Sequence, residues 1–174
     1  MQRFSLAILI MATCSGASWA ASEKVELNLV TAQSVGQSIG TVTVTETEGG
    51  LQFTPELKAL PAGEHGFHIH ANGNCQPAIV DGKATAAGAA GGHFDPQNTG
   101  KHAGPEGDGH LGDLPAIRVD AEGNARESVV APRIKNLDEV RGKALMVHAG
   151  GDNMADHPKP LGGGGERVAC GVIK

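Results

Sequence analysis

The sequence predicts an all-β domain, an antiparallel sandwich or barrel of about eight strands. Apolar and polar residues alternate over residues 24–29 and 41–45, which is the two-residue period of a half-buried strand. Turn-forming residues, such as Glu48-Gly49-Gly50, separate the later short apolar stretches. Those stretches lie at 51–53, 66–70, 117–119, 127–130, 144–148 and 168–173.

Two long segments interrupt this pattern. Residues 71–113 are rich in Gly, Ala and His, and residues 149–165 end in four consecutive glycines. Loops of this length in a compact domain are either disordered or held by something other than a hydrophobic core, such as a metal or a disulfide. Before the stretch at 144–148, Leu137 to Val140 can form a short helical turn. We therefore expect two long functional loops on a β scaffold.

The first twenty residues have the layout of a secretory signal peptide. Arg3 gives a positive start, Phe4 to Met11 form an apolar run, and Ser18-Trp19-Ala20 supplies small residues at the cleavage positions. The apolar run is far shorter than the roughly 20 residues that cross a bilayer, so a retained membrane helix is the weaker interpretation. We expect cleavage after Ala20 and a single mature domain over residues 21–174.

Export also bears on the cysteines. Cys14 leaves with the signal peptide, so Cys75 and Cys170 remain in the mature chain. Oxidising compartments favour a disulfide over two free thiols, so we expect the remaining pair to be bonded.

Charge and composition exclude a nucleic-acid-binding function. Removal of residues 1–20 takes away Arg3 alone, so the basic residues fall from 14 to 13 against 19 acidic residues, and the net charge moves from −5 to −6. The mature chain has no Trp after the loss of Trp19, and the whole sequence has no Tyr, so platforms for stacking bases are essentially absent. After removal of the signal peptide we expect no membrane partner either.

Histidines gather at predicted strand ends and in the long loops. His68 and His70 stand two residues apart in a predicted strand, so both side chains lie on one face while those of Phe67 and Ile69 lie on the other. Taken alone, such a pair is more often a solvated strand face than a metal site. The following loop has almost no large apolar side chains, but it adds further metal-binding residue types at His93, His102, His110 and Asp113.

These residue types suit two metals. Three imidazoles and one carboxylate form the closed tetrahedral set that structural zinc prefers, and imidazole binds both zinc and copper. His148 ends the predicted strand at 144–148 and can join His68 and His70 from across the sheet. The pattern therefore predicts a zinc site in the long loop and a copper site beside it.

The sequence resembles the Cu,Zn superoxide dismutases through Gly66-Phe67-His68-Ile69-His70 and through GGGGERVACGVI at 162–173. The run DPQNTGKH at 95–102 is similar to the bacterial periplasmic branch. The resemblance implies an eight-stranded Greek-key β-barrel and a periplasmic enzyme that converts two superoxide radicals and two protons to oxygen and hydrogen peroxide. It also implies one copper ion and one zinc ion per subunit. The implied copper ligands are His68, His70, His93 and His148, and the implied zinc ligands are His93, His102, His110 and Asp113.

The same resemblance assigns roles to residues around the metals. Arg167 would bind superoxide beside the copper, although a surface ion pair is its alternative role. His93, shared by both metals, would take up a proton and return it as peroxide leaves. Asp152 would tie a copper ligand to a zinc ligand, and Cys75 would pair with Cys170.

Copper would be the working metal, because dismutation needs alternating reduction and reoxidation and zinc has no accessible redox couple. Zinc would be structural and would order residues 93–113. The alternatives are a periplasmic copper- or zinc-binding protein without turnover and a zinc hydrolase, which needs an open zinc position. A monomer is favoured and a homodimer is the alternative. His65 and His157 lie outside the ligand set, and we expect structural or surface roles for them.

Overall fold

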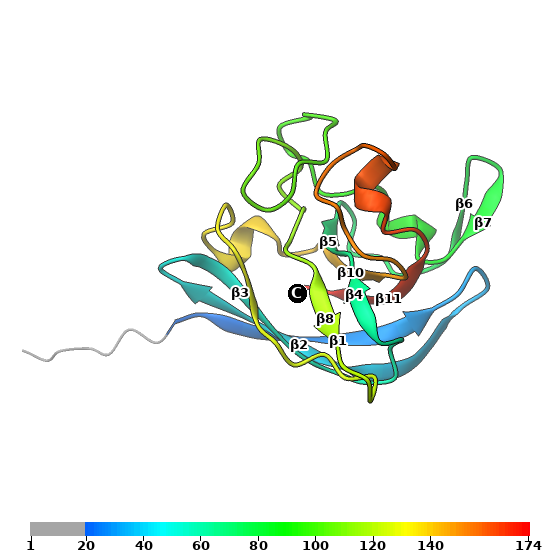
Figure 1. Cartoon of the computed structure of the whole chain (residues 1–174), viewed down its shortest axis with the longest axis horizontal. Coiled ribbons are helices and arrows are strands. Elements are labelled where there is room, and N and C mark those ends of the chain that lie inside the picture. The colour runs from blue at the N-terminus through cyan, green and yellow to red at the C-terminus, as the bar shows by residue number, and fades with distance from the viewer. Residues whose placement is uncertain (1–19) are drawn as a thin grey trace, which may run out of the picture.

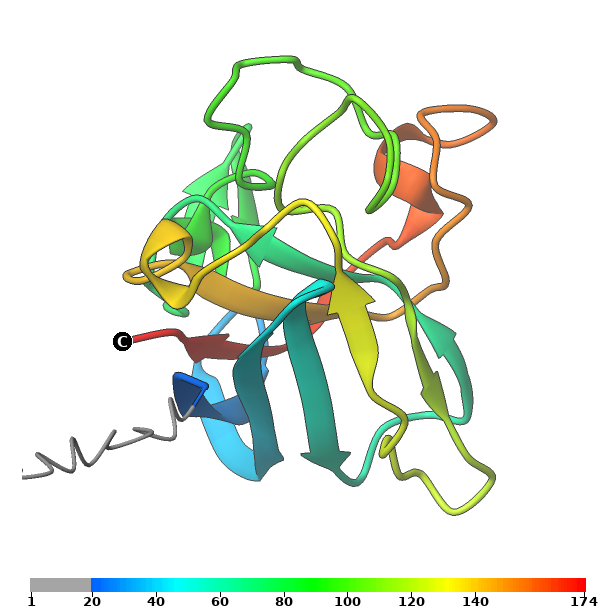
Figure 2. The same cartoon turned by 90° about the vertical axis from the view of Figure 1, so that its left-hand side faces the viewer.

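The computed structural model describes residues 20–174, and its scaffold is a curled antiparallel sheet (Figures 1 and 2). The main sheet has seven strands in the order β5-β10-β11-β1-β2-β3-β9, β4 pairs with β8, and β6 and β7 form a separate hairpin. The strands are β1 Ser22–Val30, β2 Val35–Thr47, β3 Gly50–Leu57, β4 Gly63–His65, β5 Phe67–His70, β6 Ala78–Val80, β7 Lys83–Thr85, β8 Ile117–Val119, β9 Val129–Ala131, β10 Ala144–His148 and β11 Arg167–Val172. The 3₁₀ helices are η1 Gly88–Ala90, η2 Leu137–Glu139 and η3 Pro160–Gly163.

The predicted all-β fold class is confirmed, since each of the predicted strand segments overlaps a strand. The structure adds β4, β6 and β7, each of three residues and too short to show an alternation. β8 and β9 are equally short, but their apolar residues predicted them. The β6–β7 hairpin stands out from the body of the molecule within the first long loop (Figure 1). The predicted helical turn is η2, which begins with a capping box between Asn136 and Glu139.

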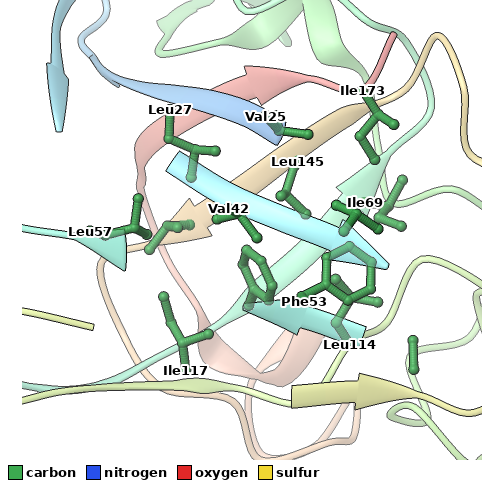
Figure 3. Packing of buried hydrophobic residues seen from close by; sticks show 14 of the residues in the cluster. Val25, Leu27, Val42, Phe53, Leu57, Ile69, Leu114, Ile117, Leu145 and Ile173 are labelled. Carbon is green, nitrogen blue, oxygen red and sulfur yellow. The ribbon is translucent and has the colours of Figure 1, made fainter. Parts of the chain in front are cut away.

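The hydrophobic core joins the inward side chains of the main sheet to those of β8 (Figure 3). Val25 and Leu27 of β1 are almost fully buried, as the alternation predicts. Phe53 and Phe67 meet edge to face in this core, with ring centroids 5.7 Å apart and planes at 89°. Each large side chain buried here contributes about 1.5–3 kcal/mol, so the core fixes the strands that carry the histidines.

The β5 strand lies between the core and the long loop. Phe67 and Ile69 belong to the core cluster, while His68 and His70 occupy the alternate positions that face the loop. All four side chains are buried, because the loop covers the second face of the strand. β10 pairs antiparallel with β5, and its last residue, His148, therefore ends beside the two histidines.

A second, smaller apolar cluster surrounds a disulfide. Cys75 and Cys170 are bonded, with Cα atoms 5.7 Å apart, so the predicted disulfide is present. Ala87 and Ala90, at either end of η1, pack in this cluster with Cys170. The bond links positions 95 residues apart, and closure of a loop of that size stabilises a fold by about 4 kcal/mol in the chain-entropy model. It thereby attaches the first long loop to β11.

The predicted signal peptide, including Arg3 and Cys14, lies almost entirely outside the described residues. Within residues 20–174, no helix has the length and apolar character to span a bilayer.

Candidate metal centre

Six histidines and one aspartate, remote in sequence, come together beside β5 in two groups that share one residue. Within each group, the potential ligand atoms all lie within 4.8 Å of one another, and every member is buried. The four-histidine group contains His68, His70, His93 and His148. The histidine–aspartate group contains His93, His102, His110 and Asp113.

Edge pairing with β5 places two loop residues of the groups, His93 and Asp113. β5 is the first strand of the main sheet, so one of its edges is free to pair with the loop. Phe94 donates its backbone N–H to the carbonyl of Ile69 at 2.8 Å, and Ile69 donates to the carbonyl of Gly112 at 2.9 Å. These bonds bring the neighbouring His93 and Asp113 directly alongside His70 and His68, respectively.

Hydrogen bonds set which ring nitrogens of the four-histidine group carry a proton. His70 Nδ1 donates to the carbonyl of Gly91 at 2.8 Å, and His148 Nδ1 donates to the carbonyl of Gly165 at 3.1 Å. Carbonyl oxygens only accept, so in the neutral rings the Nε2 atoms are left with lone pairs. These two Nε2 atoms face each other at 3.3 Å. Two lone pairs at that distance repel unless a cation lies between them.

The other two nitrogens of this group are also free to bind a metal. His68 donates from Nε2 to the carboxylate of Asp152, which leaves its Nδ1 with a lone pair. His68 Nδ1 and His93 Nε2 are buried and have no hydrogen-bond partner within residues 20–174. A buried polar atom without a partner is costly in a folded protein. The donor set therefore fits an imidazole-bound metal such as copper.

The histidine–aspartate group converges on a single oxygen atom. Asp113 Oδ1 lies 2.9 Å from His93 Nδ1, 3.0 Å from His102 Nδ1 and 3.3 Å from His110 Nδ1. A tetrahedral zinc ion with bonds of roughly 2.0–2.1 Å separates its ligand atoms by about 3.3 Å. The spacing of these four atoms fits a closed zinc site.

Comparison with known proteins agrees with this geometry. The model of the copper/zinc superoxide dismutase (SODC) family matches residues 38–173. The chain belongs to that family. It is 74% identical to "Superoxide dismutase [Cu-Zn] 2" of Salmonella typhimurium and 72% identical to "Superoxide dismutase [Cu-Zn]" of Escherichia coli K12, each over the full length of both chains.

Two solved structures share the fold of this dismutase family member. The Cu/Zn superoxide dismutase from Brucella abortus has a TM-score of 0.87 at 51% identity, over 88% of this chain and 100% of that one. The monomeric copper, zinc superoxide dismutase from Salmonella enterica has a TM-score of 0.80 at 76% identity, with the same two coverages. The expected Greek-key barrel, dismutase activity and copper–zinc pair are confirmed, and the alternatives of a metal-binding protein without turnover and a zinc hydrolase fall away.

In this dismutase, Asp152 physically joins the two groups. Its carboxylate accepts a hydrogen bond from His68 Nε2 at 2.6 Å through Oδ2 and another from His102 Nε2 at 2.8 Å through Oδ1. The second long loop passes close enough that a Cβ atom on Gly162 would lie 1.9 Å from Asp152 Oδ1. Gly162 also has a φ of +69°, so both space and backbone conformation require glycine.

Burial keeps the rings of His70, His93 and His148 neutral. It lowers the pKa of His148 to about 3 and holds the pKa of His70 well below its usual value, and in both cases the charge of Arg167 adds to the effect. It also lowers the pKa of His93 to about 4, although the hydrogen bond to Asp113 opposes this shift. Burial also lowers the pKa of His102, but its contacts with the carboxylates of Asp113 and Asp152 outweigh this and raise the pKa to about 9. Neutral imidazoles bind metals, so a cation bound at His102 Nδ1 would replace the proton that the two carboxylates otherwise favour there.

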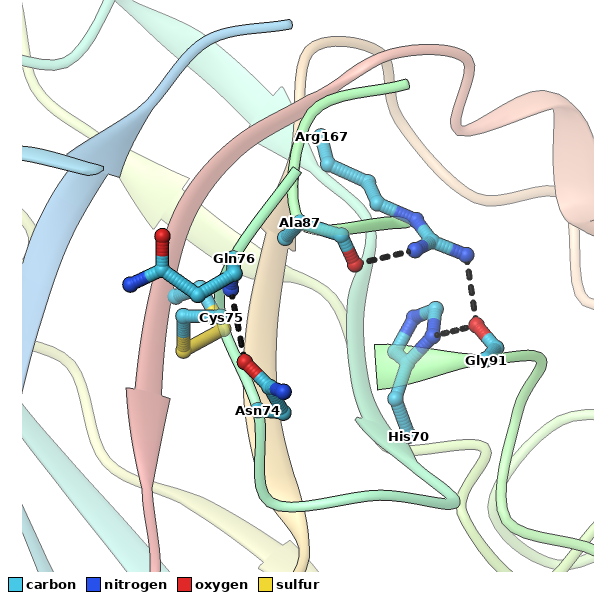
Figure 4. Close-up of a disulfide and its surroundings, with 8 residues drawn as sticks. His70, Asn74, Cys75, Gln76, Ala87, Gly91 and Arg167 are labelled. Atoms are coloured by element: carbon cyan, nitrogen blue, oxygen red, sulfur yellow. Dashed lines mark hydrogen bonds between the residues drawn. A yellow bond between two sulfur atoms is a disulfide. The ribbon is translucent and has the colours of Figure 1, made fainter. Parts of the chain in front are cut away.

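Arg167 lies beside the four-histidine group and is anchored by backbone carbonyls (Figure 4). It donates from Nη1 to Ala87 at 2.7 Å and from Nη2 to Gly91 at 2.6 Å. The Gly91 carbonyl also accepts from His70, so a single oxygen fixes the guanidinium and one ring of the four-histidine group relative to each other. Burial lowers the pKa of Arg167, but a guanidinium stays charged at neutral pH.

The two remaining histidines lie outside both groups. The ring nitrogens of His65 lie 2.7 Å from the His148 carbonyl and 2.8 Å from the Pro61 carbonyl. This buried ring therefore contacts the backbone of His148, a member of the four-histidine group. His157 is exposed.

Sequence reasoning missed the carbonyls of Gly91 and Gly165, which orient His70 and His148. It also missed Arg133, whose guanidinium reaches the loop that carries His110. Every residue has a carbonyl, so no sequence signal marks those that orient a ligand.

We predict that Asp152→Asn lowers the affinity for at least one metal by about 10–100-fold, the usual cost of removing such an orienting partner. The amide nitrogen of Asn cannot accept, so His68 or His102 loses its hydrogen-bond acceptor. Zinc and copper dissociation constants, measured by chelator competition, check this. Asp120→Asn, a change in an exposed turn, serves as the control. Wild-type affinity for both metals in Asp152→Asn would contradict the role of this carboxylate.

Proposed function

We propose that the four-histidine group holds the copper ion and the histidine–aspartate group holds the zinc ion of this superoxide dismutase. The position of His93 carries the assignment. Its Nδ1 lies 2.9 Å from Asp113 Oδ1, while its Nε2 is buried in the other group without a hydrogen-bond partner among residues 20–174. A ring placed in this way can bind two ions at once, one at each nitrogen.

The two ions have different tasks. Copper, when bound, would supply the electron transfer, because it has two accessible oxidation states and zinc has none. The histidine–aspartate group would hold the segment 93–113 in place, since this segment has few large apolar side chains. It would also keep the Nδ1 side of His93 in a defined state.

Arg167 would bind and orient superoxide. It is half-buried, its guanidinium is tied through Gly91 to His70, and no carboxylate among the described residues forms an ion pair with it. Two of its donors are used by carbonyls, and a planar fork of donors remains for a small anion. These contacts favour substrate binding over the alternative role of a surface ion pair.

His93 would move the proton that the reaction needs. The Nε2 atom of this ring is the one on the copper side, and it has no competing hydrogen bond within the described part of the chain. We expect Nε2 to hold a proton between the two halves of the cycle and to return it as peroxide leaves. The second proton consumed by the reaction would come from solvent.

Residues 1–20 would form a signal peptide cleaved after Ala20, and residues 21–174 would form one working domain in the periplasm. The apolar run of the signal and the disulfide support export. The mature protein would be a monomer, in line with the relative from Salmonella enterica that is described as monomeric.

We predict that turnover depends on copper. Purified protein loaded with both metals should consume superoxide rapidly, copper alone should give partial activity, and zinc alone should give none, because zinc cannot change its charge. Activity that ignored copper would contradict the assignment of the working metal.

Two variants extend the same loading experiment to the ligands. His148→Ala should lose copper and turnover yet keep zinc, while Asp113→Ala should lose zinc first. Metal content by mass spectrometry reports each ion separately. Equal loss of both metals in each variant would contradict two separate groups.

We predict that Arg167→Met lowers kcat/KM for superoxide by roughly 10–100-fold, since a charge-assisted hydrogen bond is worth about 1.5–3 kcal/mol. Arg167→Lys keeps the charge but not the fork, so it should lose less. Rates at several ionic strengths, on samples with matched metal content, separate substrate binding from metal loss. A fully loaded Met variant with the wild-type rate would overturn the role of Arg167.

We predict that protein recovered from the periplasm of the source bacterium begins at Ala21 and sediments as a monomer. Intact mass and analytical ultracentrifugation check the two statements. A retained N-terminal segment would contradict cleavage after Ala20, and a dimer at micromolar concentration would contradict the monomeric state.

A further inference from the structure

His110 is the least anchored member of the histidine–aspartate group. The His102 ring is oriented by Asp152, and the second oxygen of Asp113 accepts from the Ala103 N–H at 3.1 Å. His110 has the longest of the three approaches to Asp113 Oδ1, at 3.3 Å, and the described residues give its ring no second hydrogen bond. Its ring position must therefore depend on how its backbone is held.

Arg133 holds that backbone from the barrel side. Its Nη1 donates to the carbonyl of His110 at 3.1 Å, and its Nη2 donates to the carbonyl of Gly109 at 2.8 Å. On the other side of the peptide, the His110 N–H donates to the carbonyl of Lys101 at 2.9 Å. The backbone around His110 is thus fixed from two directions, and the guanidinium supplies one of them.

Arg133 is itself rigidly placed. It lies between β9 and η2, and its neighbour Ile134 is fully buried in the core. The Ile134 carbonyl accepts from the N–H of Leu51, the second residue of β3, at 2.8 Å. Because Arg133 is fixed to the barrel, its guanidinium holds the Gly109 and His110 carbonyls at a fixed distance from the barrel. The loop itself has few large apolar side chains to do this.

The loop cannot easily adjust around this contact. A Cβ atom on Gly109 would lie 2.2 Å from the carbonyl oxygen of Lys101, so the two backbone segments are already packed directly against each other. Arg133 reaches both Gly109 and His110 with one planar group, and a shift of either carbonyl would break one of the two bonds.

We propose that Arg133 is a positioning residue for the zinc site, acting through His110. The inference rests on the proposed function, since it requires that the histidine–aspartate group binds zinc. Within residues 20–174, the Arg133 side chain donates hydrogen bonds to backbone carbonyls of the loop and none to the ring nitrogens or carboxylate oxygens of the two groups. Its loss should therefore weaken zinc binding while copper binding to the zinc-loaded protein is unaffected.

The test compares Arg133→Gln, Arg133→Lys and, as a matched control, Arg118→Gln, which changes an exposed arginine on β8. Zinc dissociation constants are measured by chelator competition on full-length mature protein. We expect about 10–100-fold weaker zinc binding for Arg133→Gln. Arg133→Lys, with one ammonium in place of a fork, should fall between Gln and wild type, and Arg118→Gln should match wild type.

A spectroscopic readout and a double-mutant cycle separate positioning from general destabilisation. Cobalt(II) in the zinc site has visible absorption that depends on ligand geometry, so Arg133→Gln should change that spectrum even at full occupancy. In a His110→Ala background, Arg133→Gln should cause no further loss of zinc affinity, because the ring it positions is absent.

Three results would overturn the inference. The first is a wild-type zinc affinity in Arg133→Gln. The second is an equal loss of zinc affinity when Arg133→Gln is made in the wild-type and in the His110→Ala backgrounds, since this would show that Arg133 acts on the loop as a whole. The third is an unchanged zinc affinity in His110→Ala alone, which would overturn the assignment of His110 as a zinc ligand together with this inference. The first two results overturn only the role of Arg133, so the two kinds of failure can be distinguished.

Discussion

The structure depends on the convergence of unprotonated ring nitrogens in a buried cluster. The Nε2 atoms of His70 and His148 lie 3.3 Å apart inside a buried cluster, and only positive charge can balance their lone pairs. Burial lowers the pKa of His93 and of His148, so protonation cannot supply that charge at neutral pH. Metal cations can. The carbonyls of Gly91 and Gly165 and the carboxylate of Asp152 fix which nitrogens remain free for them.

The barrel supplies rigidity, and the loops supply most of the ligands that we propose. β5 and β10 are held by the core on one side, which leaves His68 and His70 on the opposite face with little freedom. The first long loop then pairs with the edge of β5 and adds His93 and Asp113. The disulfide holds the same loop against β11, the strand that begins with Arg167. Arg167 and the metal ligands that we propose are thus positioned by the same loop and its attachments to β5 and β11.

Much of the fold follows from local patterns, and much of the site does not. Alternation at 24–29 and 41–45 predicted β1 and β2 because one face of each is buried, whereas β4, β6 and β7 are too short to show a period. The residue types predicted a zinc site in the long loop and a copper site beside it, but the complete ligand set of each ion, with His93 shared, came from the family resemblance. The contact of Arg133 with His110 was beyond prediction, since it joins a side chain to a backbone carbonyl 23 positions away in sequence.

The two groups cannot be positioned independently. His93 belongs to both, and Asp152 holds His68 with one oxygen and His102 with the other. A displacement of the His102 ring would move the Asp152 carboxylate. The carboxylate would in turn move the ring of His68, which belongs to the four-histidine group. An ion that orders the histidine–aspartate group therefore also orders the four-histidine group, without contact with the substrate. Because the loop between them has few apolar anchors, the ordering free energy must come from the ions and from fixed contacts with the barrel.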